Sequence, residues 1–203
     1  MILYGAPNPA PNPRRVRIFL AEKGIDLPET LVDMRKREHK APEFRAKNSL
    51  GQLPTLELDD GATISETVAI CRYFEELNPS PSLFGQTALE KAMVDMWVRR
   101  VEFVLMNPVG QYWRHAHPYT ASLLTQYKEF GESNRETVMS AMKWLDRELA
   151  EKPFVAGDAY SMADICALTT IDFADWIGLK MPDDLPHLKA WHDRVTARPS
   201  ANA

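Results

Sequence analysis

The sequence predicts an α/β region followed by an all-α region, and two observations support this division. Up to about residue 77, short β-like runs alternate with helical ones, whereas apolar residues further along recur only at helical spacing. Between the two regions, residues 78–82 combine helix-breaking prolines with small polar residues. We therefore expect domains at residues 1–77 and 86–203, joined by a linker at 78–85.

The first region is predicted to fold in the order β-α-β, then β-β-α. Strands are expected at residues 2–4, 30–32, 55–58 and 62–64, and helices at 16–23 and 68–77. Asp59-Asp60-Gly61 predicts a tight hairpin, because Asp and Gly tolerate the positive φ of such turns. The proline-rich residues 7–13 are interpreted as a strand-to-helix loop, with Asn12 as the N-cap and Pro13 at the first helical position.

Apolar spacing predicts about five helices in the second region. One buried face is formed by residues at steps of four, three and four: Val138, Met142, Leu145 and Leu149. Met93 and Trp97 repeat this spacing, and Pro108 is expected to kink or end the helix that contains them. Ser161 and Asp164 have the spacing of a capping box, which we interpret as structural.

Composition excludes several classes of function. The chain has 203 residues, 45% of them apolar, and 28 acidic against 24 basic residues, so it lacks the basic field that nucleic-acid binding needs. No apolar run approaches the roughly 18 residues of a membrane span, and no signal peptide is recognised. Cys71 and Cys166 lie among apolar neighbours and form no metal or dithiol motif. We expect a cytoplasmic protein that binds no metal, membrane or nucleic acid.

Two motifs in the first region suggest ligand binding. Leu53-Pro54 directly precedes a strand, where a proline is tolerated and a cis bond costs little; an ordinary strand-start proline is the alternative. Ser65-Glu66-Thr67 opens the next helix, where free N–H groups could hold a carboxylate and Glu66 an ammonium. The alternative is that Ser65 caps this helix and Glu66 complements its dipole.

These motifs, in this order and spacing, resemble the cytosolic glutathione transferase family, with a bacterial theta- or nu-like member as the best match. The resemblance implies a thioredoxin-like N-terminal domain, an all-helical C-terminal domain, a homodimer, and glutathione as co-substrate. By the same resemblance, Leu53 and Pro54 present backbone to the cysteinyl part of glutathione. Glu66 and Thr67 correspond to positions that hold its γ-glutamyl end.

The resemblance also assigns residues to the opposite end of glutathione. His39 and Gln52 match positions that contact the glycyl carboxylate in some classes. His39 lies in the basic run of residues 34–40, so exposure to solvent is the alternative for this side chain.

The chain departs from the family at the residue that activates the thiol. Ala10 occupies the position where many members have serine or cysteine, and alanine cannot donate to a thiolate. Asn12 lies two residues further on, and its amide N–H groups could face a sulfur, so we expect Asn12 to be the catalytic residue. Tyr4 and backbone N–H groups are the alternatives, with packing favoured for Tyr4.

The expected reaction is attack of bound glutathione thiolate on a small electrophile. Reduction of a disulfide or peroxide with glutathione is a further possibility. The electrophile is expected between the domains, against Met106, Tyr112, Trp113 and His115. Core packing of Trp113 and solvation of His115 are the alternatives, and a non-catalytic binding or assembly module is the alternative function.

Overall fold

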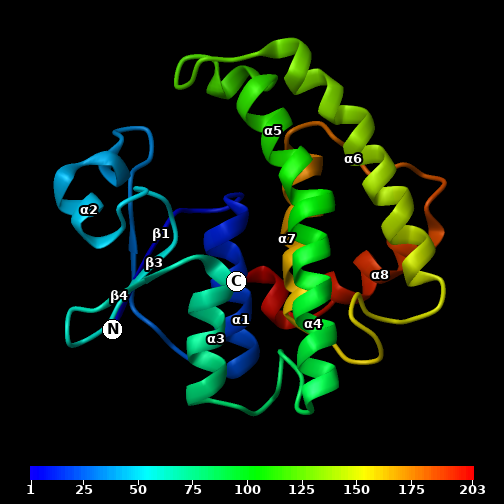
Figure 1. Cartoon of the computed structure of the whole chain (residues 1–203), viewed down its shortest axis with the longest axis horizontal. Coiled ribbons are helices and arrows are strands. Elements are labelled where there is room, and N and C mark those ends of the chain that lie inside the picture. Colours follow the sequence, from blue (N-terminus) through cyan, green and yellow to red (C-terminus); the bar gives the residue numbers. More distant parts are fainter. The chain divides into compact units, whose positions relative to one another are not determined.

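The computed structural model describes all 203 residues, which form two compact units (Figure 1). The first unit contains residues 1–83 together with 199–203, and the second contains residues 84–198. The end of the chain, which the sequence analysis assigned to the helical region, packs against helix α1 (Pro11–Lys23). There Arg14 donates to the Ala201 carbonyl at 2.9 Å, and the Ser200 hydroxyl donates to the Glu22 carboxylate.

The first unit is built on a four-stranded sheet with the order β2-β1-β3-β4. Its strands are β1 (Ile2–Gly5), β2 (Glu29–Leu31), β3 (Thr55–Glu57) and β4 (Thr63–Ser65). Strand β1 pairs parallel to β2 and antiparallel to β3, which pairs antiparallel to β4. The predicted hairpin is present, with Gly61 at φ 86° and the Leu58 N–H donating to the Ala62 carbonyl at 2.8 Å.

Three helices accompany the sheet: α1, α2 (Pro42–Lys47) and α3 (Thr67–Leu77). Helices α1 and α3 lie side by side on one face, and α2 lies on the other (Figure 1). Helix α2 is not predicted from the sequence, because six residues are too few to show helical periodicity. The core between the sheet and the α1–α3 pair contains side chains that are at most 2% exposed: Leu3, Val16, Phe19, Leu56, Ile70 and Phe74.

A buried ion pair fastens the end of α3 and the segment that follows it. The Lys23 ammonium pairs with Glu75 and donates to the Asn78 carbonyl at 2.7 Å. Glu75 also accepts from the Ser82 hydroxyl at 3.0 Å and from the Leu83 N–H at 3.1 Å. The first part of the predicted linker is therefore held in place by side chains of α1 and α3.

The second unit contains five α-helices, as predicted. They are α4 (Ala88–Arg100), α5 (Asn107–His115), α6 (Lys128–Leu149), α7 (Met162–Trp176) and α8 (Pro186–Thr196). Helix α7 is buried along almost its whole length and forms the centre of this unit. The predicted face of α6 is confirmed, because all four of its apolar residues are buried.

Of two expectations about α4, the one for Pro108 agrees with the structure and the one for Met93 is wrong. The chain is kinked rather than ended at Pro108: a π-helical segment (Val101–Met106) joins α4 to α5, and α5 leans away from the direction of α4 (Figure 1). Proline has no N–H and clashes with the carbonyl four residues earlier, so a locally wider turn accommodates it. Met93 is 37% exposed, whereas Val94, Trp97 and Val98 form the buried face of α4.

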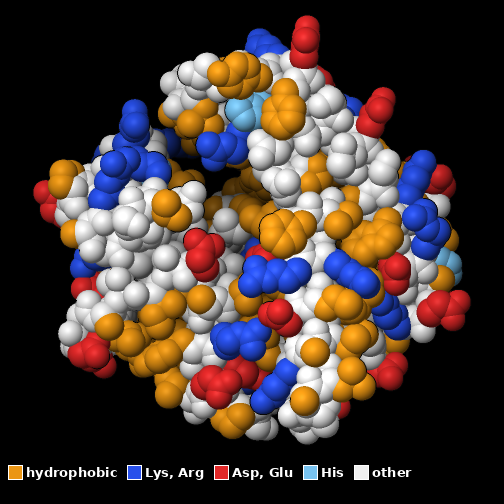
Figure 2. Space-filling model, viewed as in Figure 1, with side chains coloured by type: hydrophobic (Ala, Val, Ile, Leu, Met, Phe, Trp, Pro, Cys, Tyr) orange, Lys and Arg blue, Asp and Glu red, His pale blue; other side chains and the backbone are white.

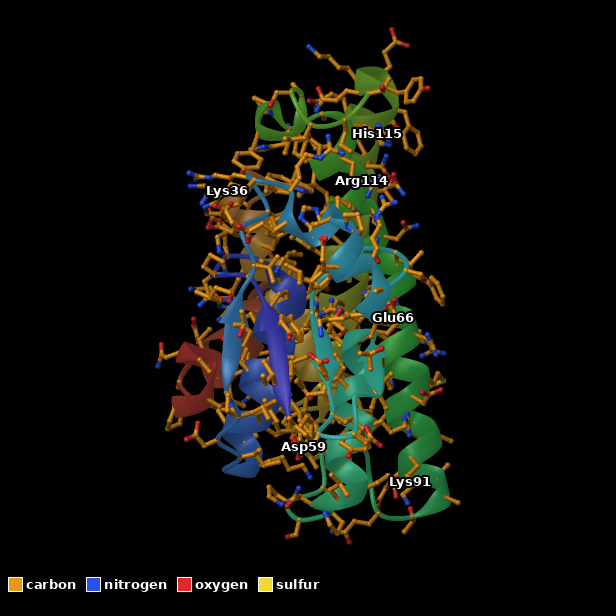
Figure 3. The ribbon with its side chains drawn as sticks, turned by 90° about the vertical axis from the view of Figure 1, so that its left-hand side faces the viewer. Lys36, Asp59, Glu66, Lys91, Arg114 and His115 are labelled. Carbon is orange, nitrogen blue, oxygen red and sulfur yellow. The ribbon has the colours of Figure 1, made fainter.

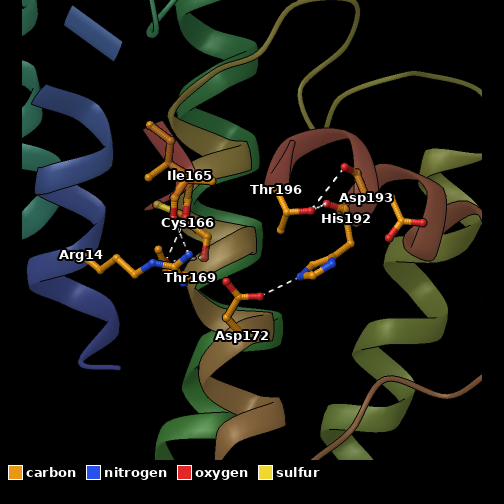
Figure 4. A network of polar contacts seen from close by, with 9 residues as sticks. Arg14, Ile165, Cys166, Thr169, Asp172, His192, Asp193 and Thr196 are labelled. Carbon is orange, nitrogen blue, oxygen red and sulfur yellow. Dashed lines mark hydrogen bonds and ion pairs between the residues drawn. The ribbon is translucent and has the colours of Figure 1, made fainter. Parts of the chain in front are cut away.

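Helix α8 is attached to its neighbours by polar contacts. Asp146 on α6 accepts from the backbone N–H groups of His187 and Leu188, both at 2.9 Å, and so satisfies the first turn of α8. His192 Nε2 lies 2.7 Å from Asp172 Oδ1 on α7 (Figure 4). Both contacts join residues that are far apart in the sequence, so the spacing of apolar residues does not predict them.

Candidate active site

The candidate glutathione residues of the first unit lie at one end of the sheet. Thr55, at the start of β3, pairs with Ser65 at the end of β4 and with Tyr4 near the end of β1. Gly5 pairs with Leu31 at the end of β2. The segments that follow β1, β2 and β4 and the segment that precedes β3 therefore all leave the sheet at the same end.

The side chains at the two ends of the sheet can be followed in Figure 3. Glu66, after β4, and Lys36, after β2, lie toward one end, and Asp59 of the hairpin lies toward the other. The sheet topology thus brings together the segments that contain Asn12, His39, the pair Leu53-Pro54 and the pair Glu66-Thr67.

The start of α1 differs from the predicted one. The helix begins at Pro11, and Ala10 is its N-cap residue, without a side-chain cap. Asn12 is consequently the second helical residue, and the expectation that it caps the helix is wrong. Proline suits the first turn because the N–H groups there have no intrahelical partner, and this holds for Pro11 as well as for Pro13.

This start leaves few donors for a ligand. Pro11 and Pro13 have no N–H, and the Ala10 N–H already donates to the Pro7 carbonyl at 3.2 Å. Among the first three residues of α1, only Asn12 offers a backbone N–H. Its side-chain Oδ1 is buried and has no hydrogen-bond partner. Since buried polar atoms are normally paired, this amide is a candidate for contact with a ligand.

Tyr4, the alternative donor, is engaged elsewhere. Its hydroxyl donates to Glu57 Oε2 at 2.7 Å, and Lys47 Nζ lies 2.7 Å from both oxygens of the same carboxylate. The hydrogen bond to Glu57, together with burial, raises the pKa of the Tyr4 hydroxyl. The Tyr4 ring also packs edge-on against Phe44 of α2, with centroids 5.9 Å apart. These contacts favour a packing role for Tyr4.

The loop before β3 is organised by one buried side chain. Asn48 Nδ2 donates to the Gln52 carbonyl at 3.0 Å and to Thr55 Oγ1 at 3.1 Å, while its Oδ1 accepts from the Leu50 N–H. The Leu53–Pro54 peptide bond is cis. Leu53 lies outside the strand pairing, so its backbone polar groups are not used by the ladder. The Gln52 side chain is exposed.

The segment that contains His39 packs directly on this loop. A Cβ atom at Gly51 would lie 2.4 Å from the His39 carbonyl, and Gly51 has φ 56°. Lys40 Nζ donates to the Gly51 carbonyl at 2.6 Å. His39 Nδ1 is buried without a partner, and burial lowers the pKa of His39, assisted by the cations Lys40 and Arg37. A neutral His39 is thus brought close to the loop of Gln52.

Cationic side chains surround this part of the unit. Figure 2 shows Lys and Arg gathered over the region of α2. The exposed ones in this part of the sequence are Arg35, Lys36, Arg37 and Arg45. Such a cluster creates a positive potential that suits a ligand with two carboxylates.

The start of α3 also departs from expectation. Ser65 belongs to β4, so it does not cap α3; Glu66 occupies the cap position with φ 72° and makes no side-chain cap bond. A non-glycine residue at positive φ is uncommon and is found disproportionately at functional sites. Thr67 is the buried first residue of α3, and the N–H groups of this turn are free of helical partners.

The candidates for the second substrate lie on or next to α5. Met106 ends the π segment and is half-buried. Tyr112 is buried, and its hydroxyl accepts from Arg135 of α6 at 2.7 Å, which makes it part of the α5–α6 contact. His115 is half-buried and packs against Tyr127 and Phe130, with centroids 5.6 and 5.5 Å away. The alternative that His115 is solvated holds only in part, because two rings cover one side of this half-buried side chain.

Trp113 is the centre of an aromatic group that sequence analysis missed. Four further rings belong to it: His117, Tyr119, Phe173 and Trp176. The first two follow α5 in a loop, and the last two lie on α7. The spacing of three between the α7 residues was the available signal, but it is equally typical of core packing.

The capping box at the start of α7 is present, as predicted, and it is structural. Asp164 is fully buried and accepts from the Val155 N–H, from Trp191 Nε1, and from the N–H and hydroxyl of Ser161, at 2.8 to 3.1 Å. Burial raises the pKa of Asp164 to about 6. No group of three or more His, Cys, Asp or Glu side chains could hold a metal ion, and none of the helices combines the length and apolar character needed to traverse a bilayer.

Comparison with known proteins agrees with this geometry. The family Glutathione S-transferase, N-terminal domain, matches residues 10–77, and Glutathione S-transferase, C-terminal domain, matches residues 112–199. Glutathione S-transferase 2 of Saccharomyces cerevisiae is 42% identical over 98% of this chain and 87% of its own length.

Solved structures give the same result. The crystal structure of Gtt2 from Saccharomyces cerevisiae matches with a TM-score of 0.93 and 41% identity, covering 100% of this chain and 99% of the other. A glutathione S-transferase domain-containing protein from Marinobacter aquaeolei has a TM-score of 0.92 and 40% identity, covering 98% and 99%. The thioredoxin-like sheet and the helical region are thus both shared with these proteins, and the chain belongs to the glutathione S-transferase family of enzymes.

Proposed function

We propose that this chain binds glutathione at the end of its sheet where Glu66 and Leu53 lie, and that Asn12 stabilises the bound thiolate for attack on a small electrophile. The observation that carries the proposal is the first turn of α1, where Asn12 lies between two prolines without N–H groups and offers donors on its backbone N–H and on Nδ2. Membership of the family supports glutathione conjugation in general.

The proposed role of Asn12 follows from the scarcity of other donors. Ala10 has no polar side-chain atom, Pro11 and Pro13 have no N–H, and the Tyr4 hydroxyl donates to Glu57. The Asn12 amide carries two N–H donors on Nδ2, and the positive end of the α1 dipole favours an anion nearby. Together they would lower the pKa of the bound thiol and raise the fraction of the nucleophilic thiolate.

The two ends of glutathione would be held by different chemistry. The free N–H groups at the start of α3 suit the γ-glutamyl carboxylate, and the Glu66 carboxylate suits its ammonium group. At the other end, the His39 ring and the Gln52 amide would contact the glycyl carboxylate. The Leu53 backbone would bind the cysteinyl part between them.

In the proposed reaction, the thiolate sulfur forms a bond to an electrophilic carbon, and the leaving group departs with the displaced electron pair. Met106, Trp113 and His115 are proposed to contact this electrophile, with Tyr112 supporting them from the core. We further propose that the protein is a cytoplasmic homodimer, as the family resemblance implies.

The proposal is tested by titrating the ultraviolet absorbance of the thiolate of bound glutathione in the wild type and in Asn12→Ala. We expect the bound thiol to ionise below the pH at which free glutathione does. In the variant its pKa should rise by about one unit, which corresponds to about 1.4 kcal/mol, and kcat/KM should fall about tenfold. Asn8→Ala is the matched control, since Asn8 lies in the same loop but bonds to Arg17 at 2.6 Å.

Two outcomes would contradict the assignment. If the titration is unchanged in Asn12→Ala and shifted in Tyr4→Phe, the tyrosine is the donor. If glutathione binds but its thiol never ionises early, thiolate activation is absent. Assays with an alkyl halide, a glutathione mixed disulfide and an organic peroxide would then separate conjugation from reduction.

A further inference from the structure

Charge is distributed unevenly along this chain. Residues 31–52 contain six Lys and Arg against three Asp and Glu, a balance of +3. The remaining residues contain 18 basic and 25 acidic side chains, a balance of -7, and the two parts together give the net charge of -4. A positive segment therefore belongs to an otherwise acidic protein, and the average over the whole chain conceals it.

The acidic side chains of the turn after β2 are used for its own folding. Asp33 Oδ1 accepts from the backbone N–H groups of Arg35 at 2.8 Å and of Lys36 at 3.2 Å. Glu38 Oε2 accepts from the Asp33 N–H at 2.8 Å. These bonds fix the turn, in which Arg37 has φ 60°. The carboxylates of the turn thus stabilise its backbone rather than its cationic side chains.

Most of the cations in this part of the first unit have no carboxylate close to them. Arg35, Arg37 and Arg45 are exposed and form no ion pair. The Lys36 ammonium lies 3.8 Å from Asp33, and its side chain is 75% exposed (Figure 3). Cations concentrated without intervening anions create a positive potential at the surface, which attracts anionic partners.

Exposed apolar side chains lie among these cations. Met34 is 44% exposed, and Leu50, in the loop before β3, is 59% exposed. Lys40 joins the turn to this loop, because its Nζ donates to the Leu50 carbonyl at 3.0 Å and to the Gly51 carbonyl at 2.6 Å. Arg45 Cγ lies 3.5 Å from the position of a Cβ atom at Gly51. We call this group the basic surface, and it contains Met34, Arg35, Lys36, Arg37, Arg45 and Leu50.

We propose that the basic surface docks this protein reversibly on a membrane surface that contains anionic lipids. Cationic side chains are attracted to the phosphate groups of such lipids. Exposed Met and Leu side chains enter the boundary between headgroups and acyl chains, where their apolar area is removed from water. A soluble polyanion would neutralise the cations but leave Met34 and Leu50 exposed, so the combination of charges and apolar side chains favours a lipid surface.

Docking of this kind does not depend on glutathione or on Asn12, so it goes beyond the proposed function. The expectation that no membrane is bound rests on the charge of the whole chain and on the lack of long apolar runs. Docking at a surface needs only a local excess of cations with a few apolar side chains beside them. Because its main component is electrostatic, it should depend strongly on ionic strength.

The experiment is cosedimentation of the full chain, without glutathione, with vesicles of phosphatidylcholine alone or of phosphatidylcholine mixed with phosphatidylglycerol. In about 0.1 M salt we expect binding at least about tenfold tighter to the vesicles that contain phosphatidylglycerol. In about 1 M salt, where the screening length falls to about 3 Å, this preference should be lost. Soluble glycerol phosphate tests the headgroup alone, and it should not displace the protein at the same phosphate concentration.

Variants test the charges of the basic surface. The double variant Arg35→Gln with Lys36→Gln should weaken binding to the anionic vesicles about thirtyfold, at about fivefold for each cation removed. Lys91→Gln with Lys180→Gln is the matched control, because it removes two exposed lysines outside the basic surface and changes the net charge equally. The control should change the affinity by less than about twofold.

Further variants test the apolar side chains without changing the charge. Met34→Ser and Leu50→Ser should each weaken binding to the anionic vesicles about fivefold. Both positions are exposed, so the fold should stay intact, and thermal unfolding of each variant checks this.

Several results would overturn the proposal. Equal binding to neutral and anionic vesicles, or equal losses in the two double variants, would show that the basic surface is not used. Displacement by glycerol phosphate would reduce it to a site for free phosphate. Tighter binding to poly-L-glutamate than to anionic vesicles at the same concentration of negative charge would assign it to an acidic protein partner.

Discussion

Two polar side chains near helix starts, one in each unit, differ in whether their buried oxygen atoms accept hydrogen bonds. The Asp164 carboxylate in the first turn of α7 is fully buried and accepts four hydrogen bonds. The Asn12 amide in the first turn of α1 has a buried oxygen that accepts none. Because an unpaired buried polar atom costs about 1–3 kcal/mol, the first arrangement stabilises the fold and the second is tolerated at its expense.

The same contrast extends to the helix starts themselves. Helices α4 and α7 begin with capping boxes, whereas α1 and α3 have no side-chain cap, and α3 begins at a residue with φ 72°. The starts of α1 and α3 lie at the candidate glutathione site, whereas α5 and α6 lack a side-chain cap in the second unit. We infer that α1 and α3 keep their helix-start donors for a ligand, while α7 uses its own for stability.

The largest effect is expected when the satisfied carboxylate is removed. Asp164→Ala leaves the donors of Val155, Ser161 and Trp191 buried without an acceptor. The free energy of unfolding should fall by about 3–5 kcal/mol in urea titrations. Asp158→Ala, an exposed position near the same helix start, should change it by less than about 0.5 kcal/mol. Equal effects of the two substitutions would mean that the hydrogen bonds to Asp164 do not stabilise the fold.

The pKa of Asp164 predicts a pH dependence with a definite sign. Its folded pKa of about 6 exceeds the unfolded value, so the native state holds a proton that the unfolded state has lost. The contribution of this raised pKa to the free energy of unfolding is fully present below about pH 4. It is lost as the pH rises through 6, and the total loss is about 3 kcal/mol. The difference in unfolding free energy between wild type and Asp164→Asn should therefore decrease across this window. A constant difference would show that the four donors keep the carboxylate ionised.

Gly51 links the candidate site to the fold of the first unit. Gly51→Ala combines positive φ with a Cβ only 2.4 Å from the His39 carbonyl, so we expect a loss of about 1–3 kcal/mol in stability together with weaker glutathione binding. Gly24→Ala is the matched control, because Gly24 also has positive φ, 64°, but open space around it. We would measure glutathione binding by calorimetry and unfolding in urea for both variants. Gly24→Ala reports the cost of positive φ alone, and the additional loss in Gly51→Ala reports the steric clash with His39.

Glu66 should show opposite effects on stability and on binding. Glu66→Gly relieves the backbone at φ 72° and should raise the unfolding free energy by about 1 kcal/mol, while removal of the carboxylate weakens glutathione binding. Arg37→Gly, which relieves φ 60°, should stabilise similarly without a comparable loss of affinity. Loss of both stability and affinity in Glu66→Gly would mean that this residue supports the fold.

The smallest change in stability is expected for Asn12→Asp. A carboxylate in the first turn of α1 interacts favourably with the helix dipole, so unfolding free energy should rise by about 0.5 kcal/mol. The same charge repels a thiolate, so the pKa of bound glutathione should rise above its wild-type value. A stability loss instead would show that Asn12 is needed by the fold.

The candidate site was predicted only in part. The sequence identified the segments that contain Asn12, Leu53 and Glu66, because prolines, a helix start and a strand start are local signals. It misplaced the helix starts by one or two residues: Ala10, not Asn12, occupies the cap of α1, and Ser65 belongs to a strand. Alternating prolines fit more than one register of a helical first turn, so local sequence alone does not choose between them.

Local sequence by itself determined the order of the strands and of every helix except α2, the hairpin at residues 59–61 and the capping box of α7. These features depend on backbone preferences and on side chains a few residues apart. Only the tertiary structure decided that Tyr4 donates to Glu57, that His39 packs on Gly51, and that Trp113 contacts two rings of α7. Those contacts join residues distant in sequence, and their geometry follows from how sheet and helices pack rather than from any local pattern.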